Sequence, residues 1–174
     1  LTQDPSFQAN AWSLRRIFRR RGFWDNLVRV LDAEARFAAL PARRDRASLL
    51  VDKGRVLADR LGRRPDGRAA FLAALDIDAD HPAALVSLLV EASTAGPAEA
   101  LERALAGLAR VAGTARAKAT FVCALARAER ARGTPEAFAH AADTLHRALT
   151  SGADLPMLLA ELERLSLLAK RPEL

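Results

Sequence analysis

The sequence predicts an all-α protein built from stacked helical hairpins, and three observations support this fold class. The chain has 174 residues, of which 51% are hydrophobic and 5% aromatic, and Ala, Leu and Arg, all good helix formers, dominate it. Apolar residues recur at helical spacing, and β-branched residues never form a strand-like run. The pattern is interrupted by Gly22, Gly62, Gly96 and Gly133, which are separated by 40, 34 and 37 residues.

An amphipathic segment precedes each of these glycines, and another follows it. Before Gly22 the apolar stripe consists of Phe7, Ala11, Leu14 and Phe18. After it, Leu27, Leu31 and Ala35 form a second stripe at helical spacing. Each glycine therefore marks the turn inside a helical hairpin. Because one hairpin cannot cover both of its apolar stripes, we expect successive hairpins to stack.

Helix starts and ends are marked by residues with defined backbone preferences. Asp4 and Thr134 are expected N-caps, and the first helical turn tolerates proline at Pro5, Pro82, Pro97 and Pro135. Gly22, Gly96 and Gly133 are expected to end helices in the left-handed conformation. These signals predict helices at residues 6–21, 23–39, 43–61, 66–77, 82–95, 97–112, 114–132, 135–150 and 155–170.

The predicted helices pair into four repeats in a single domain, at about 6–40, 43–79, 82–112 and 114–152, with an extra helix at 155–170. This last helix is apolar on more than one side, with leucines at 155, 158, 159, 162, 165, 167 and 168. A terminal capping helix should have a polar outer face. We therefore expect either self-association through this helix or further repeats, in a longer protein of which this chain is a piece.

The repeats resemble those of the tetratricopeptide repeat (TPR) family, which has units of about 34 residues. The residues that carry the resemblance include Ala11, Leu14, Phe18, Gly22, Trp24 and Leu27 in the first repeat, Gly54, Ala74 and Pro82 in the second, Gly96, Ala100 and Ala104 in the third, and Leu125, Gly133 and Ala148 in the fourth. Arg15 departs from the family pattern, because a small residue is usual at its place. The resemblance implies a right-handed superhelix that binds a peptide or a partner's helix in a concave groove.

In such a superhelix the first helix of each repeat would line the groove. The partner-binding residues expected there are Trp12, Arg16, Arg19, Arg20, Arg127 and Arg130. Further groove residues would be Val51, Arg55, Asp59, Val86, Val90, Ser93 and Cys123. Arginine makes bidentate bonds to carboxylates, so this groove would suit an acidic or C-terminal peptide. The alternative interpretation of these arginines is an ordinary solvated face.

The basic charge lies mostly in the N-terminal part of the chain. The net charge is +6, divided into +8 for residues 1–68 and −2 for the rest. The preference for Arg over Lys is typical of a GC-rich, bacterial genome, or else indicates an anionic partner. A nucleic-acid-binding module using the basic N-terminal half is the alternative function. Against it, Trp12, Val86 and Cys123 provide no recurring polar code for bases.

The sequence offers no catalytic constellation, so we expect a non-enzymatic protein-interaction scaffold without cofactor or metal. The three histidines do not form a metal motif, since His81 is in a linker and His140 and His146 point in different directions on one helix. The single cysteine, Cys123, excludes an internal disulfide and is expected to be buried. No apolar run is long enough to span a membrane. We expect a cytoplasmic protein.

Overall fold

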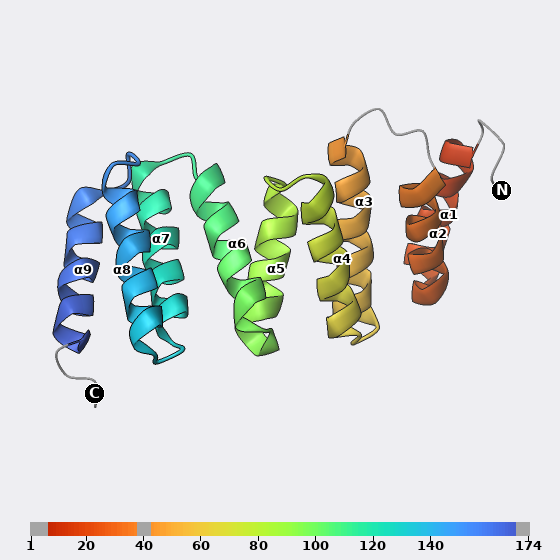
Figure 1. The fold of residues 1–174 in the computed structure, drawn as a ribbon. Helices are drawn as coiled ribbons and strands as arrows, with labels where there is room; N and C mark the ends of the chain where they lie inside the picture. Colours follow the sequence, from red (N-terminus) through yellow and green to blue (C-terminus); the bar gives the residue numbers. More distant parts are fainter. Residues whose placement is uncertain (1–6, 38–42, 170–174) are drawn as a thin grey trace. The chain divides into compact units, whose positions relative to one another are not determined.

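The computed structural model describes residues 7–37 and 43–169, and in this part of the chain all regular secondary structure is helical (Figure 1). The expected cap Asp4 and Pro5 lie outside the described residues. The helices are α1 (Phe7–Arg21), α2 (Trp24–Phe37), α3 (Arg43–Arg55), η1 (Val56–Arg60), α4 (Arg64–Ile77), α5 (Pro82–Ala95), α6 (Ala98–Val111), α7 (Ala115–Arg130), α8 (Pro135–Leu149) and α9 (Leu155–Ala169). The predicted all-α class is confirmed. The predicted ends at residues 6, 39 and 170 lie outside the described residues, and the other predicted helix ends differ from the observed ones by at most two residues. The helix predicted at 43–61 corresponds to α3 together with η1, a π-helical turn that continues it.

The helices form two compact units, and the division between them falls within α5. Unit 1 extends to Glu91 and unit 2 begins at Ala92. In unit 1, α2 packs against α1 and α3, and α3 packs against α4. In unit 2, α7 packs against α6, α8 and α9, and Figure 1 shows α7, α8 and α9 as successive antiparallel helices. Within each unit, helices therefore pack mainly on their neighbours in the chain.

Each unit has a hydrophobic core of its own. The core of unit 1 includes the predicted stripe of α2, with Leu27 and Leu31 fully buried and Phe18 packed against them. The core of unit 2 is rich in alanine. Its buried members are Ala109, Ala119, Val122, Cys123, Ala126, Ala141, Leu145, Ala148, Ala153, Leu158 and Leu165. Small side chains at a helix contact allow the axes of neighbouring helices to approach closely.

The turns follow the predicted chemistry at two of the three proposed glycine caps. Gly22 and Gly133 have φ angles of 71° and 72°, in the left-handed region that glycine adopts easily. The prediction was wrong for Gly96, which has no positive φ. Glycine is required there for space, since an added Cβ would lie 2.4 Å from the Cα of Ala92. Thr134 caps α8 as predicted and accepts a hydrogen bond from the Ala137 N–H.

A buried ion pair joins α1 to α2 at the place where the family pattern would have a small residue. Arg15 Nε lies 3.2 Å from Oε2 of Glu34, whose side chain is buried. Burial raises the pKa of Glu34, and the Arg15 charge opposes this rise. The departure at Arg15 is therefore accompanied by an acidic partner on the second helix of the same hairpin.

His81 is buried and ties the start of α5 to α3, a role that the prediction of a simple linker residue missed. Its Nδ1 accepts a hydrogen bond from the Ala84 N–H, at 3.2 Å, and so caps α5. Its Nε2 lies 3.0 Å from Ser48 Oγ. Since Nδ1 accepts, Nε2 carries the hydrogen and donates to Ser48, whose hydroxyl donates in turn to the Arg44 carbonyl at 2.9 Å.

Candidate partner-binding face and polar groove

The four predicted site residues of α1 lie together on one face of this helix. Trp12 is 57% exposed, and the guanidinium of Arg16 lies 5.7 Å from the centre of its ring. Such a pair is a cation–π contact, which holds both side chains on the surface. A hollow of about 430 Å³ lies against this face and is lined by Trp12, Arg15, Arg16, Arg19 and Arg20.

Side-chain bridges connect this face of α1 to α3 and α5. Arg19 Nη2 lies 3.6 Å from Oδ2 of Asp52 on α3. Further along α3, Arg55 Nε donates to Ser87 Oγ of α5 at 3.2 Å. The adjacent Val86 and Val90 are exposed. We call the surface formed by Trp12, Arg16, Arg19, Arg20, Asp52, Arg55, Val86, Ser87 and Val90 the first-helix face of unit 1.

Two arginines of the first-helix face differ from their neighbours in their electrostatic environment. Arg15 and Arg19 have carboxylate partners in Glu34 and Asp52. Arg16 and Arg20 are exposed, and among the described residues no carboxylate forms an ion pair with either. Beside Trp12, the face therefore carries two exposed guanidinium groups that have no ion-pair partner among the described residues.

The predicted register was wrong at two other positions. Val51 and Cys123 were expected to line a groove, but each is only 2% exposed and lies in the core. On α3 the surface passes through Asp52 in place of Val51, one residue from the predicted register, whereas Arg55 is exposed as predicted. The alternative expectation, that Cys123 is a small buried hydrophobe, is confirmed. Burial raises the pKa of its thiol, as does the nearby Glu161 carboxylate.

The two predicted site residues of unit 2 are engaged within that unit. Arg127 of α7 donates from Nε to Glu161 Oε1 at 2.9 Å and from Nη2 to Oε2, a bidentate pair with α9. The hydrogen bond from Arg127 lowers the pKa of the Glu161 carboxyl. Arg130 lies over the ring of Phe138 on α8, 6.0 Å from its centre. Their role in partner binding stays a prediction.

These bridges share one spacing in the sequence. Arg19 and Asp52 are 33 residues apart, Arg55 and Ser87 are 32 apart, and Arg127 and Glu161 are 34 apart. The same spacing, 33, separates Ser48 from His81 and Lys118 from the Ser151 carbonyl that it binds. Within each unit, residues about one predicted repeat apart thus lie side by side.

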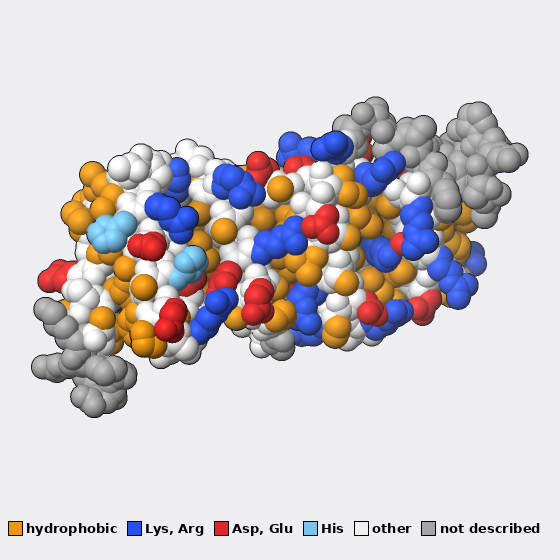
Figure 2. All heavy atoms as spheres, viewed as in Figure 1, with side chains coloured by type: hydrophobic (Ala, Val, Ile, Leu, Met, Phe, Trp, Pro, Cys, Tyr) orange, Lys and Arg blue, Asp and Glu red, His pale blue; other side chains and the backbone are white. Residues whose placement is uncertain are grey.

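Sequence reasoning missed a polar groove in unit 2. It has a volume of about 680 Å³ and is lined by residues of α6, α7 and α8 and by Ser151, which follows α8. Figure 2 shows acidic, basic and histidine side chains interleaved on the face of unit 2 towards the viewer. The residues that line the groove are Glu99, Glu102, Arg103, Ala106, Ala109, Arg110, Lys118, Val122, Leu125, Glu129, His140, Thr144, Arg147, Ala148 and Ser151.

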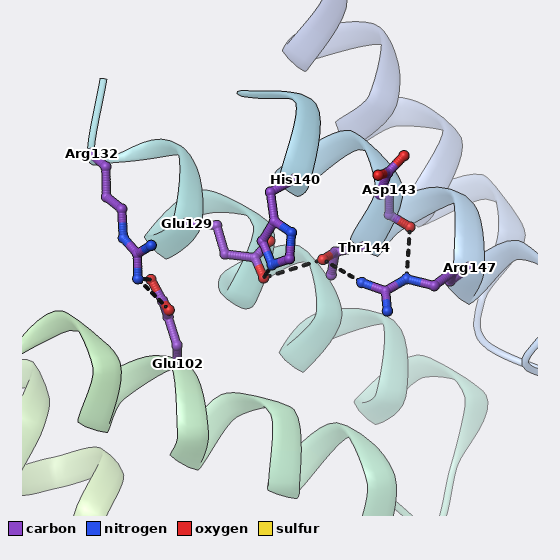
Figure 3. Close-up of polar contacts among 7 residues, drawn as sticks. All are labelled: Glu102, Glu129, Arg132, His140, Asp143, Thr144 and Arg147. Carbon is purple, nitrogen blue, oxygen red and sulfur yellow. Dashed lines mark hydrogen bonds and ion pairs between the residues drawn. The ribbon is translucent and has the colours of Figure 1, made fainter. Parts of the chain in front are cut away.

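Among the charged residues that line this groove, Glu129 is the one that is buried, and Figure 3 shows its contacts. It is only 6% exposed, and its Oε1 accepts a hydrogen bond from Thr144 Oγ at 3.2 Å and lies 3.2 Å from His140 Nε2. Its Oε2 is buried and has no hydrogen-bond partner among the described residues. Burial raises the pKa of Glu129, and the Thr144 hydrogen bond and His140 oppose this rise.

Two further features, a metal site and a membrane-spanning helix, are absent from the described residues. No group of three or more His, Cys, Asp or Glu side chains among them is arranged to hold a metal ion. None of the helices in residues 7–37 and 43–169 is long and apolar enough to cross a membrane.

Comparison with known proteins gives no relative from which a function could be transferred. No protein-family model matches the chain, and neither the curated proteins nor the solved structures contain a significant match.

Proposed function

We propose that the protein is a non-enzymatic, TPR-like scaffold that binds an acidic peptide or partner helix on the first-helix face of unit 1. The single observation on which this rests is the exposed group formed by Trp12, Arg16 and Arg20, with Arg16 stacked on the indole and no carboxylate of the described residues paired with either arginine. Arginine side chains recognise carboxylates in a bidentate manner. An exposed tryptophan adds a large apolar contact, which is typical of binding hot spots.

The spacing of the side-chain bridges supports the repeat architecture of this proposal. Residues 32 to 34 positions apart contact each other through Arg19, Arg55 and Arg127, and a right-handed TPR-like superhelix brings equivalent positions of successive first helices together at this interval. Exposed valines on α5, Val86 and Val90, would extend the binding surface along an apolar segment of the partner.

The test is a binding titration with a fluorescent acidic peptide of Glu and Leu residues, followed by anisotropy. We expect Arg16→Glu combined with Arg20→Glu to weaken binding by about a hundredfold or more, since two charge-assisted hydrogen-bonding groups are lost and repulsion is added. The matched control combines Arg43→Glu with Arg46→Glu, the same change of charge at exposed positions of α3. This control should keep most of the affinity.

Three outcomes would contradict the proposal. Unchanged affinity in the Arg16/Arg20 variant would exclude this face, and an equal loss in both variants would indicate attraction by net charge alone. Tighter binding of a random single-stranded DNA than of the peptide, with a steep dependence on salt, would favour the nucleic-acid alternative. Trp12→Ala separates the apolar contribution, because it leaves every charge of the face in place.

A further inference from the structure

We propose that two copies of this chain associate through the outer face of α9, with the two α9 helices side by side around a two-fold axis. This face belongs to unit 2, whereas the proposed function rests on the first-helix face of unit 1. The inference therefore does not depend on the proposed function, and either can fail without the other.

Two N-caps show how α9 corresponds to α7. Thr114 accepts a hydrogen bond from the Ala117 N–H at the start of α7, and Asp154 accepts one from the Met157 N–H at the start of α9. The two capping residues are 40 positions apart. Each residue of α7 therefore corresponds to the residue 40 positions later in α9.

The face of α7 that its neighbours cover is open in α9. Five residues of α7 are buried, namely Ala119, Val122, Cys123, Ala126 and Glu129. Their equivalents in α9, none of which is buried, are Leu159, Leu162, Glu163, Ser166 and Ala169. Leu159 is 56% exposed, whereas Ala119 is fully buried. The difference arises because α7 packs against α6, α8 and α9, while the described contacts of α9 are with α7 and α8.

The open face carries a stripe with the spacing of a coiled-coil seam. Its residues recur at intervals of four and three positions, as in a heptad repeat, and they are Leu155, Leu159, Leu162, Ser166 and Ala169. We call this stripe the α9 seam. The leucines provide apolar surface, and the small Ser166 and Ala169 allow a second helix to approach closely. No residue of the α9 seam is charged, so two copies of it can meet without repulsion between like charges.

A groove between α8 and α9 provides room for the second α9. It has a volume of about 540 Å³ and includes Leu162, Ser166 and Ala169 of the α9 seam. On the side of α8, its lining residues include Phe138, Ala142 and His146. A helix seated in this groove contacts α8 and α9 at the same time.

Packing and charge select the direction of the two-fold axis. Such an interface brings the same surface of both copies together. An axis perpendicular to α9 would put both copies of α8 in the same space, because α8 lies beside both seated helices. The axis therefore runs along the helices, and the two α9 helices are parallel. This arrangement places the two Glu163 carboxylates, which lie at the groove, on opposite sides of the paired seams.

The size of this interface sets the expected affinity. The α9 seam and the groove involve about half of the 20–30 residues that each partner contributes to a stable interface. Leu155 and Leu159 are large exposed side chains, and their burial in both copies favours the dimer. We therefore expect a reversible dimer with a dissociation constant of about 10–100 µM.

The first experiment is analytical ultracentrifugation of the full chain, at concentrations from about 5 µM to about 1 mM, which bracket this constant. Leu159→Glu should weaken dimerisation at least about a hundredfold, because each dimer would bury two uncompensated charges. Leu159→Ala adds no charge and should weaken it by about tenfold. The matched control is Leu167→Glu, the same change at a leucine of α9 that is 60% exposed and lies off the seam. This control should dimerise as the wild type does.

The second experiment tests the parallel arrangement. Residues of the α9 seam lie level with their own copies, so Ser166→Cys should form a disulfide between two chains when diamide oxidises the paired thiols. Ala160→Cys, at an exposed position of α9 off the seam, is the matched control and should cross-link much more slowly. The native Cys123 is buried and adds no thiol to the surface.

Three results would overturn the proposal. A chain that stays monomeric up to about 1 mM would leave the face of α9 to a partner of another sequence. A dimer that Leu159→Glu does not weaken would use a different surface. Cross-linking of Ala160→Cys as fast as that of Ser166→Cys would contradict the paired seams. Circular dichroism checks that each variant keeps the helical content of the wild type.

Discussion

Gly54 of α3 and Gly67 of α4 face each other so closely that neither position has room for a Cβ atom. A Cβ built on Gly54 would lie 2.4 Å from Cε1 of Phe71 and 2.9 Å from the Gly67 carbonyl oxygen. One built on Gly67 would lie 2.8 Å from the Gly54 carbonyl oxygen. The two helices therefore touch backbone to backbone, and the ring of Phe71 packs over the contact.

We predict that Gly54→Ala lowers the free energy of unfolding by about 1–3 kcal/mol, the usual cost of overpacking. This is opposite to the effect expected from helix propensity, which favours Ala over Gly by roughly 1 kcal/mol. Urea denaturation followed by circular dichroism measures the difference. The matched control is Gly113→Ala, where no atom lies within 4 Å of the added Cβ. A Gly54→Ala variant as stable as the wild type would show that α3 and α4 separate at little cost.

The second prediction concerns the bidentate pair of Arg127 and Glu161. Because the Arg127 hydrogen bond lowers the folded-state pKa of Glu161, its stabilisation is present above the ordinary value of 4.5 and is lost as the pH falls through the folded-state pKa. Arg127 is half exposed, so solvent screens the pair. We expect Glu161→Gln to reduce the free energy of unfolding by about 1–2 kcal/mol at pH 7.

The pH dependence checks the cause of that loss. The difference between wild type and Glu161→Gln should shrink in denaturation curves below pH 4.5, the ordinary pKa of a glutamate, and vanish once the folded wild type is protonated. A difference that persists unchanged in strong acid would assign the loss to packing. Glu163→Gln, at an exposed position of the same helix, provides the control.

The contribution of Glu129 to stability should depend on pH in the opposite direction to that of Glu161. Burial raises its folded-state pKa above 4.5, so the folded state binds a proton more tightly than the unfolded state does. Its contribution to stability is therefore largest in acid and declines as the pH rises through the folded-state pKa. We expect Glu129→Gln to unfold at a higher urea concentration than the wild type at pH 7, with the advantage gone at pH 4. Equal urea midpoints at both pH values would contradict this account.

His81→Ala should lower the free energy of unfolding by about 1–2 kcal/mol, because it removes the N-cap of α5 and the hydrogen bond to Ser48 on α3. His81→Asn should restore part of this loss, since asparagine is a good N-cap. His146→Ala changes an exposed histidine and is the control. If the asparagine variant is no more stable than the alanine variant, the Ser48 bond outweighs the cap. Thermal denaturation measures the stability of these three variants.

The sequence was sufficient to predict the helices, because their boundaries depend on local signals. Thr134 caps the helix that it precedes, and Gly22 and Gly133 end theirs in the left-handed conformation. Gly96 shows the limit of such signals, since its glycine is required by contact with the preceding turn and not by its own φ. A local rule cannot distinguish these two reasons for the same residue.

The candidate sites were less predictable because they depend on contacts between helices. Helical spacing correctly grouped Trp12, Arg16, Arg19 and Arg20, which all lie on one helix. Whether an arginine has a partner depends on a residue a repeat away, so Asp52 and Glu161 were not anticipated. The sequence interval of 33 or 34 residues could have indicated both. The groove around Glu129 combines three helices, and no single periodicity marks it.

The nearly constant sequence separation between the bridging side chains and their partners limits which insertions and deletions the chain can accept. Arg19, Arg55 and Arg127 each contact a residue 32 to 34 positions ahead. If a whole hairpin is inserted or deleted, each remaining bridging side chain still has a residue of the next hairpin at the same sequence separation. An insertion of a few residues inside a hairpin displaces all pairs that span it. We therefore expect natural variants of this chain to differ in length by multiples of a hairpin, with shorter insertions confined to the turns.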